Sequence, residues 1–139
     1  MEITANSVQT VASNQNILFT ETPVNGPKCV VHRSGSGLVT LRGITNNCNA
    51  RFLIEFGGNI AVPTGGTAGA ISTAISVDGE PLQSSTMIVT PAAVEEYFNV
   101  SSSIYVSVPR GCCLTVAVEN TSTQSIEVQN ANLIVTRVS

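Results

Sequence analysis

The sequence predicts an all-β domain, either a two-layered sandwich or a closed barrel, and three observations support this. Apolar and polar residues alternate over short segments, as in ARFLIEF, where Phe52, Ile54 and Phe56 share one face. Gly, Pro and Asn separate these segments at regular spacing. Charged residues are only 11% of the chain and hydrophobic residues 42%, a balance that a disordered chain does not have. The length of 139 residues suits one domain.

The candidate strands follow one another with short connections. The segment AISTAISVDGEPLQSSTMIV predicts a hairpin, because Asp78-Gly79 is a favoured two-residue turn between alternating runs. Residues 90–98 are the only helix-like segment, which we expect to be one helical turn or a loop. The predicted strands are 16–22, 29–33, 38–44, 50–56, 60–63, 71–77, 81–89, 100–109, 112–120, 125–130 and 133–138.

Residues 15–139 contain no linker or change of composition, so we expect them to form one domain. Residues 1–14 are polar, and we expect an N-terminal arm that docks on a partner or contacts another subunit. This segment has neither the basic nor the apolar part of a signal peptide, and no stretch approaches the ~18 apolar residues of a membrane span. The sequence therefore predicts synthesis in a reducing cytoplasm and no membrane partner.

The cysteines raise the question of redox or metal chemistry. Cys112 and Cys113 are adjacent, so in a regular strand their thiols point to opposite faces and cannot share one metal ion. We interpret both as core or interface residues. Cys29 and Cys48 could form a disulfide if their strands are neighbours, or stay free. No C-x-x-C pair occurs and His32 is the single histidine, so we predict no metal site and no cofactor.

Catalytic patterns are missing as well. His32 has no nucleophile elbow to serve, and the adjacent Glu95 and Glu96 do not make an acid/base dyad. The glycine loop at 57–69 lacks the lysine of a phosphate-binding loop. The six Lys and Arg stand singly in a chain of net charge −3, which argues against nucleic-acid binding. We predict a protein that is not an enzyme; a calcium site built on loop carbonyls stays open.

The C-terminal half resembles a known group of proteins. The segments ISVDGEPLQSS, SIYVSVPRG, CLTVAVENTS and NANLIVTRVS resemble the trimeric jelly rolls of the tumour-necrosis-factor and complement globular-head type. The resemblance implies an antiparallel jelly-roll sandwich that forms a homotrimer through strands that are apolar on both faces. The candidate interface residues are Phe98, Tyr105, Leu133 and Val135, which in a monomer would instead fill a larger core.

The whole chain is similar to small proteins from the structural regions of tailed phages and prophages of Firmicutes. The segments MEITANSVQTVASNQNILF, LVTLRG, FGGNIAVPTGGTAGAIS, VPRGCC and VQNANLIV carry this similarity. It implies a non-enzymatic structural virion protein, a capsid decoration or head-fibre protein on the outside of the phage head. Its partner would be the major capsid protein or another virion protein, and the loops at 63–69 and 45–49 would face outward.

A carbohydrate- or receptor-binding module, such as a fibre tip or a lectin-like domain that recognises a host-surface glycan, is the alternative. Sugar sites usually stack aromatic side chains on the sugar ring, but this chain has no Trp and only Tyr97 and Tyr105. The aromatic content therefore favours the structural role.

Overall fold

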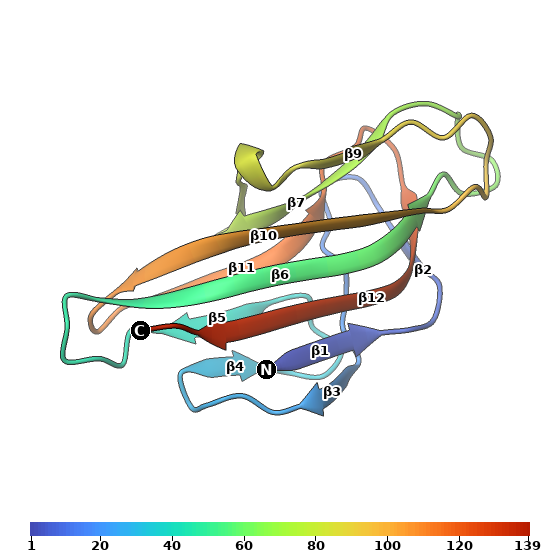
Figure 1. Cartoon of the computed structure of the whole chain (residues 1–139). Helices are drawn as coiled ribbons and strands as arrows, with labels where there is room; N and C mark the ends of the chain where they lie inside the picture. Colours follow the sequence, from blue (N-terminus) through green and yellow to red (C-terminus); the bar gives the residue numbers. More distant parts are fainter.

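The computed structural model describes residues 1–139 and contains two six-stranded antiparallel sheets packed face to face (Figure 1). Sheet A has the order β10-β6-β12-β1-β3, with β2 also paired to β12. Sheet B has the order β4-β5-β11-β7-β8, with β9 also paired to β7. The predicted sandwich is confirmed. The strands are β1 (Glu2–Ala5), β2 (Gln9–Val11), β3 (Glu21–Val24), β4 (Val30–His32), β5 (Val39–Arg42), β6 (Asn49–Ala61), β7 (Ile71–Val77), β8 (Glu80–Pro81), β9 (Met87–Val89), β10 (Phe98–Pro109), β11 (Cys113–Asn120) and β12 (Ile126–Arg137).

The core lies between the sheets and follows the alternation seen in the sequence. In β6, Phe52, Ile54 and Phe56 are buried, whereas Arg51 and Glu55 at alternate positions are exposed. Full burial of a side chain of this size contributes about 1.5–3 kcal/mol to folding. A shift of the register by one residue would turn these apolar side chains to water, so the pattern holds the strand in place.

Strands β6 and β12 are each longer than predicted. The Gly57-Gly58 pair was expected to end a strand, but β6 continues through it to Ala61. A Cβ atom at Gly58 would lie 3.3 Å from the Cα of Ala131, so glycine permits the close approach of β12. Strand β12 in turn contains an irregularity at Asn130, where φ is 55°, which joins two predicted strands into one.

The N-terminal segment belongs to the sandwich, in contrast to the arm expected from the sequence. Strand β1 lies between β12 and β3, and the Met1 ammonium donates a hydrogen bond to the Val135 carbonyl at 2.8 Å. Ile3 and Val11 are buried against the core. Residues 1–14 are mostly polar, but buried apolar side chains such as Ile3 anchor strands β1 and β2, which pair with β12. A role of residues 1–14 in docking or oligomer contact stays a prediction.

Residues 16–20 cross from one sheet to the other instead of forming the predicted strand. Ile17 and Phe19 are fully buried, and their amides donate to the carbonyls of Val118 and Ser36. The apolar alternation therefore identified core residues but not a strand, because the ladder of β3 begins only at Glu21.

The predicted hairpin is confirmed, with Asp78 and Gly79 at φ 51° and 84° in its turn. Its return strand is interrupted by a 3-10 helix, η1 (Gln83–Ser85). The buried Ser85 hydroxyl contacts the backbone N–H and carbonyl of Ile75 and so replaces part of the ladder. Residues 90–97 form a loop, as expected. No helix is long and apolar enough to cross a membrane.

Candidate oligomer interface

The structure divides the four predicted interface residues into two pairs. Leu133 and Val135 have no exposed surface in the single chain, because they point from the central strand β12 toward sheet B. They are core residues and cannot contact a partner, as in the alternative that the sequence left open. Phe98 and Tyr105 on β10 are 38% and 71% exposed and remain candidates.

Only Tyr105 of the two lies on the outer face of sheet A, the side turned away from sheet B. Phe98 belongs to the other face of β10, where it lies opposite the buried Ile60. Tyr105 lies opposite Leu53 of β6, and Leu53 lies opposite Thr136 of β12. In the next row, Ile134 is opposite Glu55. Leu53 and Ile134 face outward, and each of these apolar side chains is partly exposed. This mixture of an aromatic ring, two aliphatic side chains and few charges is typical of the centre of protein interfaces.

Strand β10 forms the edge of sheet A and contains no charged residue among its 12. Its outward positions include Ser101, Ser103 and Ser107 on either side of Tyr105. Natural proteins protect long edge strands with charges, prolines or covering elements, because an unprotected edge pairs with other chains. Pro109 stands only at the last position of the strand, and β9 and η1 of the same chain lie near β10 but do not pair with it.

A shallow hollow of about 580 Å³ lies beside Tyr105. Arg51, Ser107, Val138 and Ser139 form the rest of its lining. The hollow combines an aromatic ring, an apolar side chain and a guanidinium group, so it suits a side chain from a partner protein.

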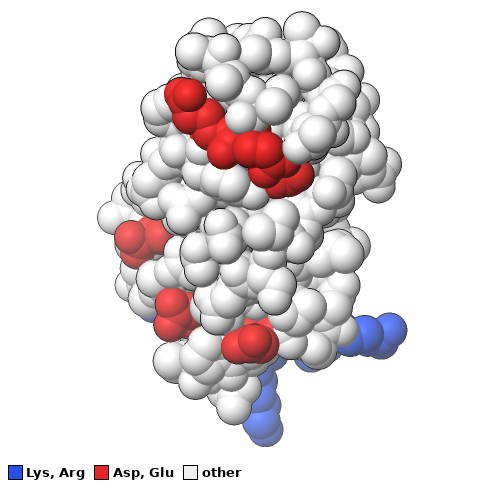
Figure 2. Space-filling view, turned by 90° about the vertical axis from the view of Figure 1, so that its right-hand side faces the viewer, with Lys and Arg blue, Asp and Glu red and all other residues white.

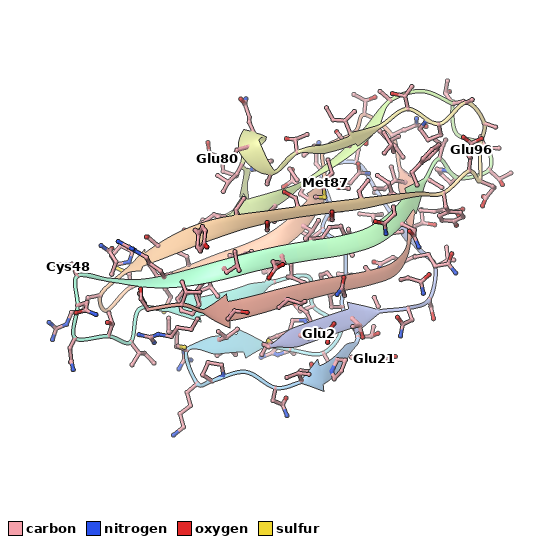
Figure 3. All side chains as sticks on the ribbon, viewed as in Figure 1. Glu2, Glu21, Cys48, Glu80, Met87 and Glu96 are labelled. Atoms are coloured by element: carbon pink, nitrogen blue, oxygen red, sulfur yellow. The ribbon has the colours of Figure 1, made fainter.

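The two loops that were expected to face outward together lie at opposite ends of the molecule. Residues 45–49 precede β6 and residues 63–69 follow it, and a strand of 13 residues is about 40 Å long. In Figure 3, Cys48 and Glu96 mark these two ends. If one end of the molecule binds a surface, only the loop at the other end faces outward. The expectation that both loops face outward is therefore corrected.

The end that contains residues 63–69 is acidic. Thr64 donates to the Glu95 carboxylate from its backbone N–H at 3.0 Å and from its hydroxyl at 2.9 Å, and these bonds hold the pKa of Glu95 below its ordinary value. Tyr97 donates to Glu127 at 2.6 Å, and this bond chiefly raises the pKa of Tyr97 to about 12. Figure 2 looks at this end: acidic side chains cross it, and basic atoms appear only at its lower margin.

Nearby at the same end, loss of hydration raises the pKa of Glu119, at the far end of β11 from the cysteines. Its backbone pairs with Asn16 in an isolated bridge.

The opposite end is basic, which the sequence did not reveal. Arg42 ends β5, and Arg51 lies near the start of β6. Arg110 follows β10, and Arg137 ends β12. The guanidinium of Arg137 lies 6.0 Å from the ring centre of Phe52. These arginines are far apart in the chain, and only the antiparallel topology brings the strand ends that carry them to one place.

Three of the four cysteines lie at this basic end. Cys48, Cys112 and Cys113 are exposed and free, so the adjacent pair is not in the core, and its place at an interface stays a prediction. The reason is that β11 begins only at Cys113, beyond the edge of the core. Cys29 is the buried cysteine and is free, so it does not pair with Cys48.

The other candidate residues make no catalytic arrangement. The His32 Nε2 atom donates to the Ser36 carbonyl at 2.9 Å in its own turn, and its buried Nδ1 atom has no partner. Glu96 is exposed beside Glu95. No group of three or more His, Cys, Asp or Glu side chains is arranged to hold a metal ion.

Comparisons with known proteins define the fold. The structure is similar to Eiger TNF from S. frugiperda, with a TM-score of 0.69 and 10% identity over 100% of this chain and 92% of that one. It is also similar to the globular domain of zebrafish complement 1qA protein, with a TM-score of 0.63 and 12% identity over 96% and 93% of the two chains. For murine APRIL the TM-score is 0.60 and the identity 9%, over 95% and 96%.

The chain therefore has the jelly-roll fold of tumour-necrosis-factor and complement globular-head domains, as the resemblance in its C-terminal half predicted. No protein-family model and no curated sequence matches it. At 9–12% identity, these structural neighbours establish the fold alone.

Proposed function

We propose that this protein is a non-enzymatic structural protein that forms a homotrimer through the outer face of sheet A. The observation that carries the proposal is the uncharged 12-residue edge strand β10 with the exposed Tyr105 at its centre. Three copies around a common axis would cover this edge and bury the tyrosine. A closed ring leaves no free edge for further pairing.

The composition of the outer face supports a permanent contact. Tyr is enriched in the buried centre of interfaces, and Ser101, Ser103 and Ser107 allow close approach of a neighbouring strand. The nearest charges across the ladder are Glu55 and Arg51, which have opposite signs. They can pair between subunits at the rim of the contact.

The native mass tests the trimer. We expect light scattering to give about three times the 14.4 kDa of the chain. Tyr105→Asp should convert the trimer to monomer, because it buries an unpaired charge at the subunit contact. Val31→Asp is the matched control: Val31 is 41% exposed and lies on β4, an edge strand of sheet B. A monomeric wild-type protein, or equal effects of the two substitutions, would contradict the proposal.

The same proposal places the trimer on the outside of a phage head, as a capsid decoration or head-fibre protein. Its support is the resemblance to phage structural proteins that the sequence segments quoted above suggest. The oppositely charged ends add to it, since one end can bind a shell while the other faces solvent. Co-expression with the major capsid protein of the same phage, followed by gradient sedimentation, is the test. Trimers that sediment apart from intact capsids at physiological salt would overturn this placement.

A receptor- or glycan-binding role is the second candidate, and one hollow favours it. Thr64, Thr67, Gln124 and Ser125 line an uncharged polar depression of about 360 Å³ at the acidic end. Gln124 holds the loop through two hydrogen bonds with the Thr67 backbone, at 3.0 and 2.7 Å. Hydroxyl and amide groups on a fixed loop suit sugar hydroxyls. Binding on a glycan array that Gln124→Ala abolishes would support this role, and no binding would exclude it.

A further inference from the structure

Exposed thiols and arginines lie together at the basic end, and the proposed trimer contact does not involve these thiols. The loop at 43–48 and the turn at 109–112 are joined by backbone hydrogen bonds. The Arg110 N–H donates to the Cys48 carbonyl oxygen at 2.9 Å, and the Gly43 N–H donates to the Cys112 carbonyl oxygen at 2.8 Å. These contacts bring three exposed thiols to the end of the sandwich from two separate chain segments. We call Cys48, Cys112, Cys113, Arg42 and Arg110 the cysteine–arginine end.

Exposure distinguishes these thiols from a typical cysteine. Free cysteine is among the most buried residue types, and Cys29 of this chain follows that rule at 4% exposure. An exposed thiol in electropositive surroundings is the kind that reacts. Residues 41–54 and 100–118 at this end contain no Asp or Glu, whereas the turn after β7, which pairs with β11, brings the Asp78 carboxylate to the same end. Asp78, on the neighbouring turn, is held by the Thr115 N–H at 2.9 Å.

One cysteine and one arginine are placed side by side by the strand register. Cys113 lies directly opposite Arg42 in the ladder of β11 and β5. Directly opposed side chains share one face of a sheet, with Cβ atoms about 5 Å apart. The planar guanidinium can bind a carboxylate with two hydrogen bonds, so it can hold an anionic molecule beside the thiol.

We propose that the cysteine–arginine end is a site of thiol–disulfide exchange with small anionic disulfides of the glutathione disulfide class, with Cys113 as the reacting thiol. The Cys113 thiolate attacks one sulfur of the disulfide, and a new bond joins that sulfur to the protein. The original disulfide bond breaks, and its other half leaves as a thiolate that takes up the proton lost by Cys113. The disulfide is the oxidant, so no further reagent is needed.

The product is a mixed disulfide that adds a carboxylate-bearing group to the basic end. Such a group would neutralise part of the arginine charge and change the partner that this end accepts. A disulfide between the adjacent Cys112 and Cys113 would require a distorted peptide geometry, so we expect the mixed disulfide at Cys113 to persist. The inference is independent of the trimer, since the reacting groups belong to one chain.

The test follows adducts on the reduced full-length protein by intact mass and peptide mapping during incubation with glutathione disulfide. We expect the first adduct on Cys113 and its loss in Cys113→Ser, whereas Cys29→Ser should react like the wild type. Arg42→Gln should slow the reaction with glutathione disulfide about threefold or more, because electrostatic attraction raises association rates. The same variant should react at an unchanged rate with uncharged 2-hydroxyethyl disulfide.

Three outcomes would overturn the proposal. The first is a wild-type rate no faster than that of the same protein unfolded in urea. The second is an equal effect of Arg42→Gln on the anionic and the uncharged disulfide. The third is an intramolecular disulfide between Cys48 and Cys112 or Cys113 as the main product. Circular dichroism of each variant excludes misfolding as the cause, and native mass measured in parallel separates this result from the trimer proposal.

Discussion

Strand β6 joins two ends of the molecule that have opposite chemistry. At its start, the loop at 43–48 contacts the turn at 109–112, where arginines and free thiols lie. At its finish, the loop at 63–69 meets Gln124 and Glu95, and hydrogen bonds of side chains hold the loop. The basic end is therefore joined chiefly by backbone contacts, whereas at the acidic end side-chain contacts add to the backbone bond from the Glu95 N–H to the Val62 carbonyl. The net charge of −3 conceals this separation.

The comparison teaches that the two ends should respond to different substitutions. Backbone contact leaves no room for a side chain, so the basic end should be sensitive to glycine replacement. Side-chain contact depends on polar groups, so the acidic end should be sensitive to loss of an amide or a carboxylate.

The largest difference is expected for glycine replacements. A Cβ atom at Gly43 would overlap the Pro109 carbonyl oxygen, so Gly43→Ala must separate the two loops and should cost about 3 kcal/mol of unfolding free energy. Gly65 has φ +90° but open space around it, so Gly65→Ala should cost only about 1 kcal/mol in backbone strain. Urea unfolding measures both, and equal losses would show that the basic end is not close-packed.

Asn120 gives the next largest effect, at the acidic end. Its buried amide donates to the carbonyls of Val11 and Gln124 at 3.0 Å each, and its carbonyl oxygen accepts from Ser122 N–H. Asn120→Ala should cost about 2 kcal/mol, because buried backbone groups lose their partners. The exposed Asn47 at the basic end is the control, and Asn47→Ala should change stability by less than about 0.5 kcal/mol. Similar losses for both would remove the distinction between the ends.

A smaller effect is the pH dependence from Glu95. Its pKa is lowered in the folded protein by the hydroxyl and backbone bonds from Thr64, so ionised Glu95 adds stability above its ordinary pKa of 4.5. That contribution is lost as the pH falls through the folded-state pKa. The melting temperature of Glu95→Gln should therefore lie below the wild type at pH 7 and approach it toward pH 3. Glu96→Gln is the control, and a difference that is constant over this range would contradict the prediction.

The smallest expected change is spectroscopic. The bond to Glu127 raises the pKa of Tyr97 to about 12, so in Tyr105→Phe the remaining tyrosine should ionise near pH 12. Adding Glu127→Gln removes the carboxylate and should move the midpoint toward 10. Absorbance of the tyrosinate follows the titration, with circular dichroism as a check that the fold persists. A midpoint that does not respond to Glu127→Gln would show that the bond is absent in solution.

Local patterns predicted the parts of the fold that depend on local physics. The Asp78-Gly79 turn was predictable because both residues tolerate a positive φ, which the tight hairpin requires. The apolar positions of β6 were predictable because alternation specifies which face is buried. The Gly57-Gly58 pair was misleading, because glycine at a close strand contact has the same sequence signature as glycine in a turn.

The candidate interface was only half predictable. Apolar residues at successive positions indicate that both faces of β12 are covered. They do not show whether the same chain or a partner subunit covers each face. The chain itself covers Leu133 and Val135 completely, whereas Ile134 between them stays partly exposed on the outer face. Tyr105 could be selected because its neighbours alternate, but its 71% exposure depends on β10 lying at the edge of sheet A.

By itself, the sequence determined the all-β class, the tight hairpin and most of the core, because periodicity and turn chemistry act between residues close in the chain. Only the tertiary structure decided that four scattered arginines and three thiols share one end, that the two glycine- and asparagine-rich loops lie at opposite ends, and that β10 is an edge. These features depend on strand order and on where each strand ends. They arise from non-local pairing, which the spacing of residues along the chain does not encode.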